Sequence, residues 1–249
     1  MSADFSMPNL GGNLMSTQVS SLLIKALKEG EYSTCERLPA EVDLAVRLGV
    51  SRTVIRDALS DLEREGFIER VRGIGTVINR NIVGLDNRLD LKFEYNELIK
   101  NAGYRPHTDN VRTRIELADS TLSFQLEVDV GSPIVVCEKR ILANDRPVIY
   151  SVDYIAMELF GNRDINGIDW SRPVFDILDK DCGAMVTSNI THVSATNGDP
   201  AVREKLALSS YEALLLMDEI SYSKLCRPVM RSLSYYTDFF DFTMLRKKF

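Results

Sequence analysis

The chain has 249 residues, enough for two domains of ordinary size, and its content of 45% hydrophobic and 27% charged residues is typical of a globular protein. Its net charge of -6 argues against a nucleic-acid partner unless basic residues gather locally, and the stretch up to Arg80 is nearly neutral, with ten basic and eleven acidic residues. No apolar run approaches the roughly 18 residues of a membrane span and no secretory signal opens the chain, so we expect a cytoplasmic protein without membrane contact.

The cysteine and histidine content limits the chemistry further. The four cysteines are scattered, with neither metal-ligand spacing nor the pattern of a disulfide framework. His107 and His192 are the only histidines, which excludes a multi-histidine metal site. We therefore predict reduced thiols, no metal and no cofactor.

The first 80 residues carry a helical pattern. Residues 1–14 are polar and contain glycine, and we interpret them as a disordered leader. Apolar residues recur at spacings of three and four over 19–27, which predicts an amphipathic helix. A second, short helix is predicted over 39–48. Ser51 is then placed to cap the start of a third helix, which ends at Gly66.

A β-hairpin is predicted directly after these helices. Residues 67–71 and 76–78 are rich in β-formers and flank a glycine-containing turn. Three helices followed by a hairpin is the order of a winged helix-turn-helix, which we assign to residues 15–80. Residues 81–91 are polar and are predicted to form a linker. Residues 92–249 then follow a pattern of strands and short helices, beginning with a helix predicted over Phe93 to Ala102 and ending at Gly103. The fold class is therefore α+β with a mainly antiparallel sheet.

The second domain contains an internal repeat. Residues 146–154 and 227–235 both read R-P-V-x-x-S-x-x-Y, at an offset of 81 residues. Each copy follows an apolar run, and Asn144-Asp145 supplies turn chemistry in the first. Two related hairpins predict one antiparallel sheet with helices on one face. The repeat either forms a ligand pocket between its halves or only builds a core.

The third helix carries a pattern suited to reading DNA. The second helix of a helix-turn-helix enters the major groove, and its N-terminal residues contact base edges. Arg52 and Arg56 are four residues apart and share one helix face, and arginine can donate two hydrogen bonds to guanine. The alternative is that these arginines merely solvate a surface. The candidate DNA-binding residues are Arg37, Ser51, Arg52, Thr53, Arg56, Arg72 and Gly73.

These residues resemble the winged-helix signature of the GntR family of bacterial transcription regulators. The resemblance covers about sixty residues and is carried by Glu36-Arg37-Leu38-Pro39-Ala40-Glu41, Leu48-Gly49-Val50-Ser51-Arg52, Ile55-Arg56-Asp57-Ala58-Leu59 and Gly73-Ile74-Gly75-Thr76. It implies a homodimer that binds a palindromic operator in double-stranded DNA. Members of the family are usually repressors that a metabolite releases from DNA.

The second domain resembles the UTRA effector domain of the HutC subfamily, which shares the chorismate-lyase fold. The resemblance is carried by Asp145-Arg146-Pro147-Val148, Asp153-Tyr154-Ile155 and Arg227-Pro228-Val229. It implies a bound small-molecule effector, and the arginines among the candidate contacts would suit an anionic one. Ile141 and Ser151 depart from the pattern of sugar-phosphate-binding members, which leaves the effector class open.

By position, six residues are candidate effector contacts: Arg140, Ser151, Asp153, Tyr154, Arg231 and Tyr235. Strand alternation places Ser151 and Asp153 on one face and Tyr154 on the other, so the six cannot all line one cavity.

Two other functions remain open at this point. The chorismate-lyase fold can host catalysis, which would make the second domain an enzyme fused to a DNA-binding domain. The sequence offers no Ser-His-Asp set, paired-carboxylate motif or metal cluster to support this. The second domain could also serve only to dimerise a DNA-binding protein, with no effector.

Overall fold

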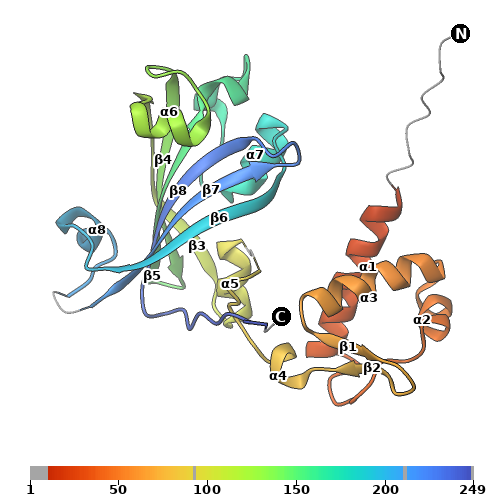
Figure 1. Ribbon diagram of the computed structural model, residues 1–249. Helices are drawn as coiled ribbons and strands as arrows, with labels where there is room; N and C mark the ends of the chain where they lie inside the picture. The colour runs from red at the N-terminus through yellow and green to blue at the C-terminus, as the bar shows by residue number, and fades with distance from the viewer. Residues whose placement is uncertain (1–10, 92–93, 210–211, 248–249) are drawn as a thin grey trace, which may run out of the picture. The chain divides into compact units, whose positions relative to one another are not determined.

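The computed structural model divides the chain into two compact units (Figure 1). It describes residues 11–91, 94–209 and 212–247. The first unit comprises the residues up to Arg88 together with those from Thr243 onward, and the second comprises Leu89–Phe242. The predicted fold class is confirmed: a winged helix-turn-helix precedes an α+β domain with one antiparallel sheet.

Three helices form the core of the first unit: α1 (Gly11–Lys28), α2 (Glu41–Leu48) and α3 (Arg52–Arg64). Each is amphipathic, and Leu27, Leu44 and Leu59 are almost completely buried. Helix α1 begins at Gly11, within the predicted leader, whose residues 1–10 lie outside the described part of the chain.

The wing consists of two short antiparallel strands, β1 (Ile68–Val71) and β2 (Gly75–Ile78). A single helical turn, α4 (Arg80–Val83), follows within the segment predicted as linker. The Arg80 guanidinium donates hydrogen bonds to the carbonyl oxygens of Leu27 and Cys35, each at 3.0 Å. These bonds tie the end of the wing to the end of α1.

The C-terminal residues of the chain rejoin this unit. Thr243 and Arg88 form an isolated parallel β-bridge, and the Thr243 amide donates to the Asn87 carbonyl at 3.2 Å. Arg88 is itself buried, with its guanidinium over the Phe67 ring. The predicted second domain ran to residue 249, but the structure groups the residues from Thr243 onward with the winged helix.

The same C-terminal segment, residues 243–247, closes the end of α3. The Lys247 Nζ donates to the carbonyl oxygens of Glu63 at 3.0 Å and Arg64 at 2.8 Å. The last carbonyls of a helix have no partner within the helix, so the lysine satisfies two of them. Leu245 lies against Gly66, whose backbone has a φ of +83°.

The second unit is built on one six-stranded antiparallel sheet of order β3-β4-β5-β8-β7-β6 (Figure 1). Its strands are β3 (Pro106–Leu117), β4 (Pro133–Ala143), β5 (Arg146–Ala156), β6 (Val186–Thr196), β7 (Leu214–Ser223) and β8 (Pro228–Tyr236). Its helices are α5 (Tyr95–Asn101), α6 (Ser120–Leu126), α7 (Val174–Cys182) and α8 (Pro200–Lys205), with 3-10 turns η1 (Met157–Phe160) and η2 (Ile165–Gly167). The predicted helix near Ala102 is α5, and residues 92–93 before it lie outside the described part.

The internal repeat is a real structural duplication. The order β3-α6-β4-β5 recurs as β6-α8-β7-β8, and the two copies meet where β5 pairs with β8 at the centre of the sheet. Asp119 caps α6 and Asp199 caps α8, each through a 2.8 Å bond from a backbone amide.

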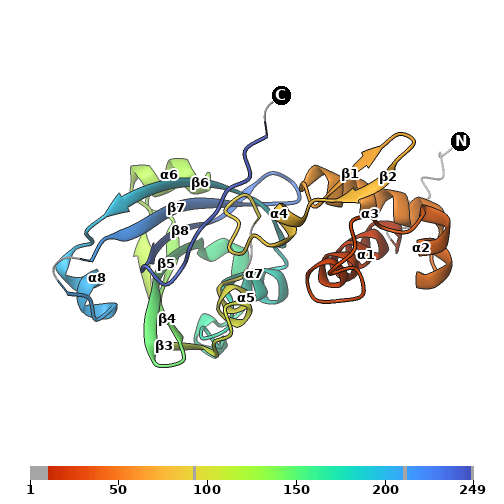
Figure 2. The same cartoon turned by 90° about the horizontal axis from the view of Figure 1, so that it is seen from below.

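Helices cover both faces of the sheet, whereas the sequence analysis expected them on one. Helices α6 and α8 pack on one face, around Val136 and Val152. Helices α5 and α7 pack on the other, around Ile149 and Ile155, and lie on the same side of the sheet in Figure 2. We name these the α6/α8 face and the α5/α7 face. The central strands β4 and β5 are buried along most of their length because both of their sides are covered.

Candidate nucleic-acid interface and effector site

The first turns of α3 present uncommitted positive charge. Ser51 accepts a hydrogen bond from the Val54 amide at 3.2 Å and so fixes the start of the helix. Arg52, Thr53 and Arg56 are exposed, and within the described part of the chain neither arginine forms an ion pair. The helix therefore offers two guanidinium groups for a partner outside the chain.

Two other arginines of this unit are already paired. Arg64, at the end of α3, lies 2.8 Å from Asp61. Arg70, on β1, lies 2.6 Å from Glu63 and also donates its amide to the same carboxylate. These contacts also hold the pKa of the Glu63 carboxyl below its ordinary value, the Arg70 side-chain hydrogen bond being the main cause. Free arginines thus lie at the start of α3 and neutralised ones near its end.

The wing supplies the remaining predicted DNA-binding residues. Arg72 and Gly73 lie exposed at its tip, and Gly73 has a φ of +80°, a conformation that favours glycine. Arg37, also exposed, donates to the Ile74 carbonyl at 3.1 Å. Arg37 therefore braces the wing tip, a contact that the sequence did not predict.

The six predicted effector contacts separate into two sets. Ser151 and Asp153 lie on the α5/α7 face of β5, as strand alternation predicted. The other four lie on the α6/α8 face: Arg140, Tyr154, Arg231 and Tyr235. The structure therefore does not bring the predicted arginines to the predicted carboxylate and hydroxyl.

Both arginines of the second set are occupied by acidic neighbours. Arg140 contacts Asp109 at 2.6 Å, and Arg231 contacts Asp218 at 2.9 Å. Each pair is joined by two N–H···O bonds, the strong geometry for arginine and carboxylate. The two arginines are thus poorly placed to bind an anionic effector.

The α5/α7 face instead holds a buried polar cluster at the junction of the two repeats. Asp153 is completely buried, and its Oδ1 accepts hydrogen bonds from Ser151 at 3.0 Å and Ser232 at 2.7 Å. These serines are the equivalent residues of the two repeats. The other carboxylate oxygen, Asp153 Oδ2, is buried without a hydrogen-bond partner among the described residues.

Further polar groups surround this carboxylate. The Tyr95 and Ser234 hydroxyls lie 2.5 Å apart, and Glu219 accepts a bond from Thr191 at 2.8 Å. Burial raises the pKa of Tyr95 well above its ordinary value, and the negative charges of Asp153 and Glu219 raise it further. The tyrosine is therefore a neutral hydroxyl at any physiological pH.

Among the described residues, the same face holds a buried cation, Lys139 on β4. Its Nζ donates to the carbonyl oxygens of Trp170 at 3.3 Å and Arg172 at 3.1 Å. Those bonds tie the segment before α7 to the sheet. Beside it, burial raises the pKa of the Cys137 thiol to about 12, so this cysteine stays protonated.

A narrow cavity of about 10 Å³, room for about one water molecule, lies beside this cluster between α5, α7 and the sheet. Its lining includes Tyr95, Phe175, Glu219 and Ser232. The lining combines aromatic and polar groups as small-molecule sites do, but a ligand larger than water requires the cavity to open. We take this cavity and the cluster around Asp153 as the candidate effector site.

Most of this site was not predicted from the sequence. Tyr95, Lys139, Glu219, Ser232 and Ser234 were not among the predicted contacts. The repeat held a usable signal, because Ser232 is the counterpart of Ser151. Glu219 follows from the register, since it lies opposite Ser232 on the neighbouring strand.

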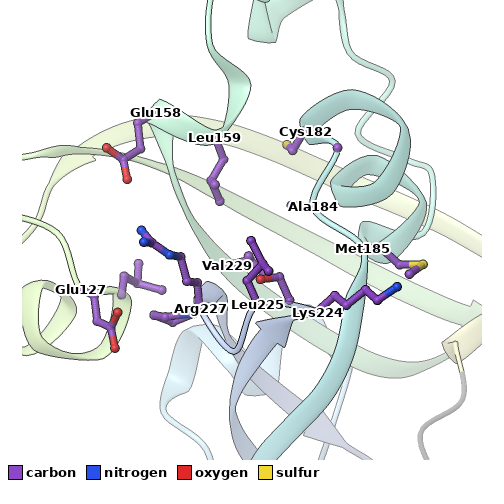
Figure 3. Close-up of a pocket in the computed structure, with 14 residues that line it drawn as sticks. Glu127, Glu158, Leu159, Cys182, Ala184, Met185, Lys224, Leu225, Arg227 and Val229 are labelled. Atoms are coloured by element: carbon purple, nitrogen blue, oxygen red, sulfur yellow. The ribbon is translucent and has the colours of Figure 1, made fainter. Parts of the chain in front are cut away.

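A second, wider pocket of about 480 Å³ lies at the β7–β8 hairpin (Figure 3). Glu127, Glu158 and Arg227 line it on one side and Lys224 on another, as Figure 3 shows. Leu225, also in the lining, is 81% exposed. The buried cluster is the stronger candidate because polar groups there have been withdrawn from water, which is costly unless a partner compensates.

Two protein-family models match separate parts of the chain. Residues 15–78 match the model of the bacterial regulatory proteins of the gntR family, and residues 101–238 match the UTRA domain. The chain belongs to the GntR family. The second match places it in the HutC subfamily, whose members are transcription regulators and not enzymes. Within the described residues, no helix is long and apolar enough to cross a membrane.

Individual relatives are distant but cover most of the chain. The chain is 24% identical to the uncharacterised regulator YurK of Bacillus subtilis over 87% of this chain and 88% of that protein. It is 28% identical to the repressor NagR of the same species over 66% of this chain and 65% of NagR. The structure of the possible regulator YydK of Bacillus subtilis superposes with a TM-score of 0.72 at 16% identity, over 94% of this chain and 99% of that one. PhnF of Mycobacterium smegmatis gives a TM-score of 0.60 at 21% identity, with 94% and 99% covered.

Proposed function

We propose that this GntR-family regulator is a homodimeric repressor that leaves its operator when a small molecule binds the α5/α7 face of its UTRA domain. The observation that carries the proposal is the buried carboxylate of Asp153 at the junction of the repeats, one oxygen of which has no hydrogen-bond partner in the described part of the chain. A face packed only for stability would bury apolar side chains there. The likeness to NagR, a repressor, supports the direction of regulation.

The DNA-binding part of the proposal assigns roles to the exposed residues of the first unit. Arg52 and Arg56 read base edges in the major groove, and Ser51 and Thr53 contact phosphates at the helix N-terminus. The wing residues Arg72 and Gly73 approach the adjacent backbone, with Arg37 supporting them. Two copies of the chain then read a palindrome whose half-sites lie about 34–36 Å apart.

Effector binding would act by a shift of population. A ligand that prefers an arrangement of the dimer in which the two α3 helices no longer match successive half-sites lowers operator affinity. The fall in operator affinity cannot exceed the difference in the ligand's affinity for the two arrangements of the dimer.

The test begins with an operator selected from random or genomic DNA by the full-length protein. Fluorescence anisotropy then measures affinity for that operator while metabolites are added, and light scattering gives the oligomeric state. A metabolite that raises melting temperature and weakens operator binding supports the proposal. Operator affinity that stays constant at saturating ligand would contradict the proposal. It would favour a UTRA domain that serves only to dimerise the chain.

A further inference from the structure

Asp153 is one of three residues of the effector domain whose side chains have a buried polar atom with no hydrogen-bond partner among the described residues. It is 0% exposed, and hydrogen bonds from the two repeat-related serines occupy only its Oδ1. Oδ2 has no partner among the described residues, and no lysine or arginine in that part of the chain forms an ion pair with Asp153. A buried carboxylate is stable only with compensating hydrogen bonds or charge, so Oδ2 is an acceptor that can still take a hydrogen bond from a ligand.

Among the described residues around Asp153, none donates a hydrogen bond to Oδ2. Lys139, on the adjacent strand, directs its Nζ to the carbonyls of Trp170 and Arg172. The Ser234 hydroxyl is engaged with Tyr95. Glu219 adds a second carboxylate on the same face.

From this geometry we propose the chemical class of the effector, which rests on the function proposed above. The site takes a small polar molecule that donates hydrogen bonds to Asp153 Oδ2 through a hydroxyl or an ammonium group. A phosphate or carboxylate is excluded from this position, because it would bring a negative charge and no donor to a buried carboxylate. This class also differs from the anionic effector that the sequence suggested, since Arg140 and Arg231 lie on the other face of the sheet.

The test measures thermal stability and calorimetric affinity of the full-length protein with two sets of probes. The donor set is myo-inositol, glucosamine and putrescine. The anionic set is inorganic phosphate and succinate, which carry negative charge but no ammonium or alcohol group. Within the donor set, inositol against putrescine separates a hydroxyl from an ammonium donor.

Two variants assign the effect to a residue. Asp153→Asn keeps the shape of the side chain and an oxygen that accepts hydrogen bonds from the two serines. It removes the negative charge and puts an NH2 group, which donates hydrogen bonds, in place of Oδ2. Asp218→Asn is the matched control, because Asp218 lies on β7 and faces the opposite side of the sheet, against Arg231. Because a hydrogen bond to a charged group is lost, the affinity for a donor probe should fall at least about tenfold in Asp153→Asn. The same affinity should be unchanged in Asp218→Asn.

Each outcome decides the matter. Stabilisation by a donor probe that Asp153→Asn abolishes and Asp218→Asn preserves supports the proposal, as does a gain of affinity for anionic probes in Asp153→Asn. Stabilisation by the anionic set alone overturns the ligand class while effector sensing stands. A donor probe that binds both variants equally, or no response from either set, also overturns the class. Failure of the proposed function shows separately, as operator affinity that no stabilising probe alters.

Discussion

Arg52 and Arg56 lie exposed at the start of α3, and within the described residues neither guanidinium has an acidic partner. Replacing either with alanine removes no intramolecular ion pair. The free energy of unfolding should therefore change by no more than about 0.5 kcal/mol, as for most surface substitutions. Any loss of DNA binding in Arg52→Ala or Arg56→Ala would then report a lost contact with DNA.

The size of that loss follows from the contact proposed. An arginine that donates two hydrogen bonds to guanine discriminates against other bases by about 1–3 kcal/mol. At about 1.4 kcal/mol per tenfold, this is about 5- to 140-fold in affinity. The loss should be confined to operators that carry the correct base pair at one position. Variants of the operator already mismatched there should bind the mutant and the wild type almost equally.

Fluorescence anisotropy with the selected operator and a set of single-base-pair variants measures this pattern. Arg64→Ala is the matched control, because Arg64 lies on the same helix with its guanidinium already paired to Asp61. A uniform loss across all sequences, with a salt dependence reduced by about one counterion, would refute base reading and indicate a phosphate contact.

Three further predictions concern stability. Ser51→Ala should lower the free energy of unfolding of the first unit by about 1 kcal/mol in urea, because it removes the cap of α3; unchanged hydrogen exchange at the Val54 amide would argue against this. Gly66→Ala, at φ +83°, should cost about 1–2 kcal/mol in the same assay. Adding Leu245→Ala should recover only the part due to crowding, so complete recovery would contradict backbone strain. The Arg140 hydrogen bond holds the pKa of the Asp109 carboxyl below its ordinary value, so this pair stabilises the fold above the unfolded pKa of about 4 and is lost as the pH falls. Wild-type stability should thus decline more steeply than that of Asp109→Asn from about pH 5 to pH 3, and parallel profiles would exclude the contribution.

Local patterns in the sequence were sufficient for the winged helix. The third helix was predicted from Ser51 to Gly66 and is observed as Arg52–Arg64, with the serine as its cap. Apolar periodicity, a capping residue and a glycine stop all act within a few residues of one another. The R-P-V repeat likewise predicted two related hairpins in one antiparallel sheet, and the structure confirms them.

The effector site needed information that no local pattern contains. Period-two alternation correctly separated Ser151 and Asp153 from Tyr154. It could not show that Arg140 and Arg231 are each paired with an aspartate, because those partners lie on neighbouring strands whose register is set by the whole sheet. Nor could it show that helices cover both faces, which depends on where the connections cross.

The course of the chain has a practical consequence for protein engineering. It passes between the two units twice, after Arg88 and before Thr243, and those two residues are bridged to each other. A fragment that stops at residue 80 lacks Arg88, Leu245 and Lys247, so it is not the winged helix of the intact protein. Grafting this effector domain onto another DNA-binding domain therefore requires two junctions, and residues 243–247 must stay with the winged helix because Lys247 closes the end of α3.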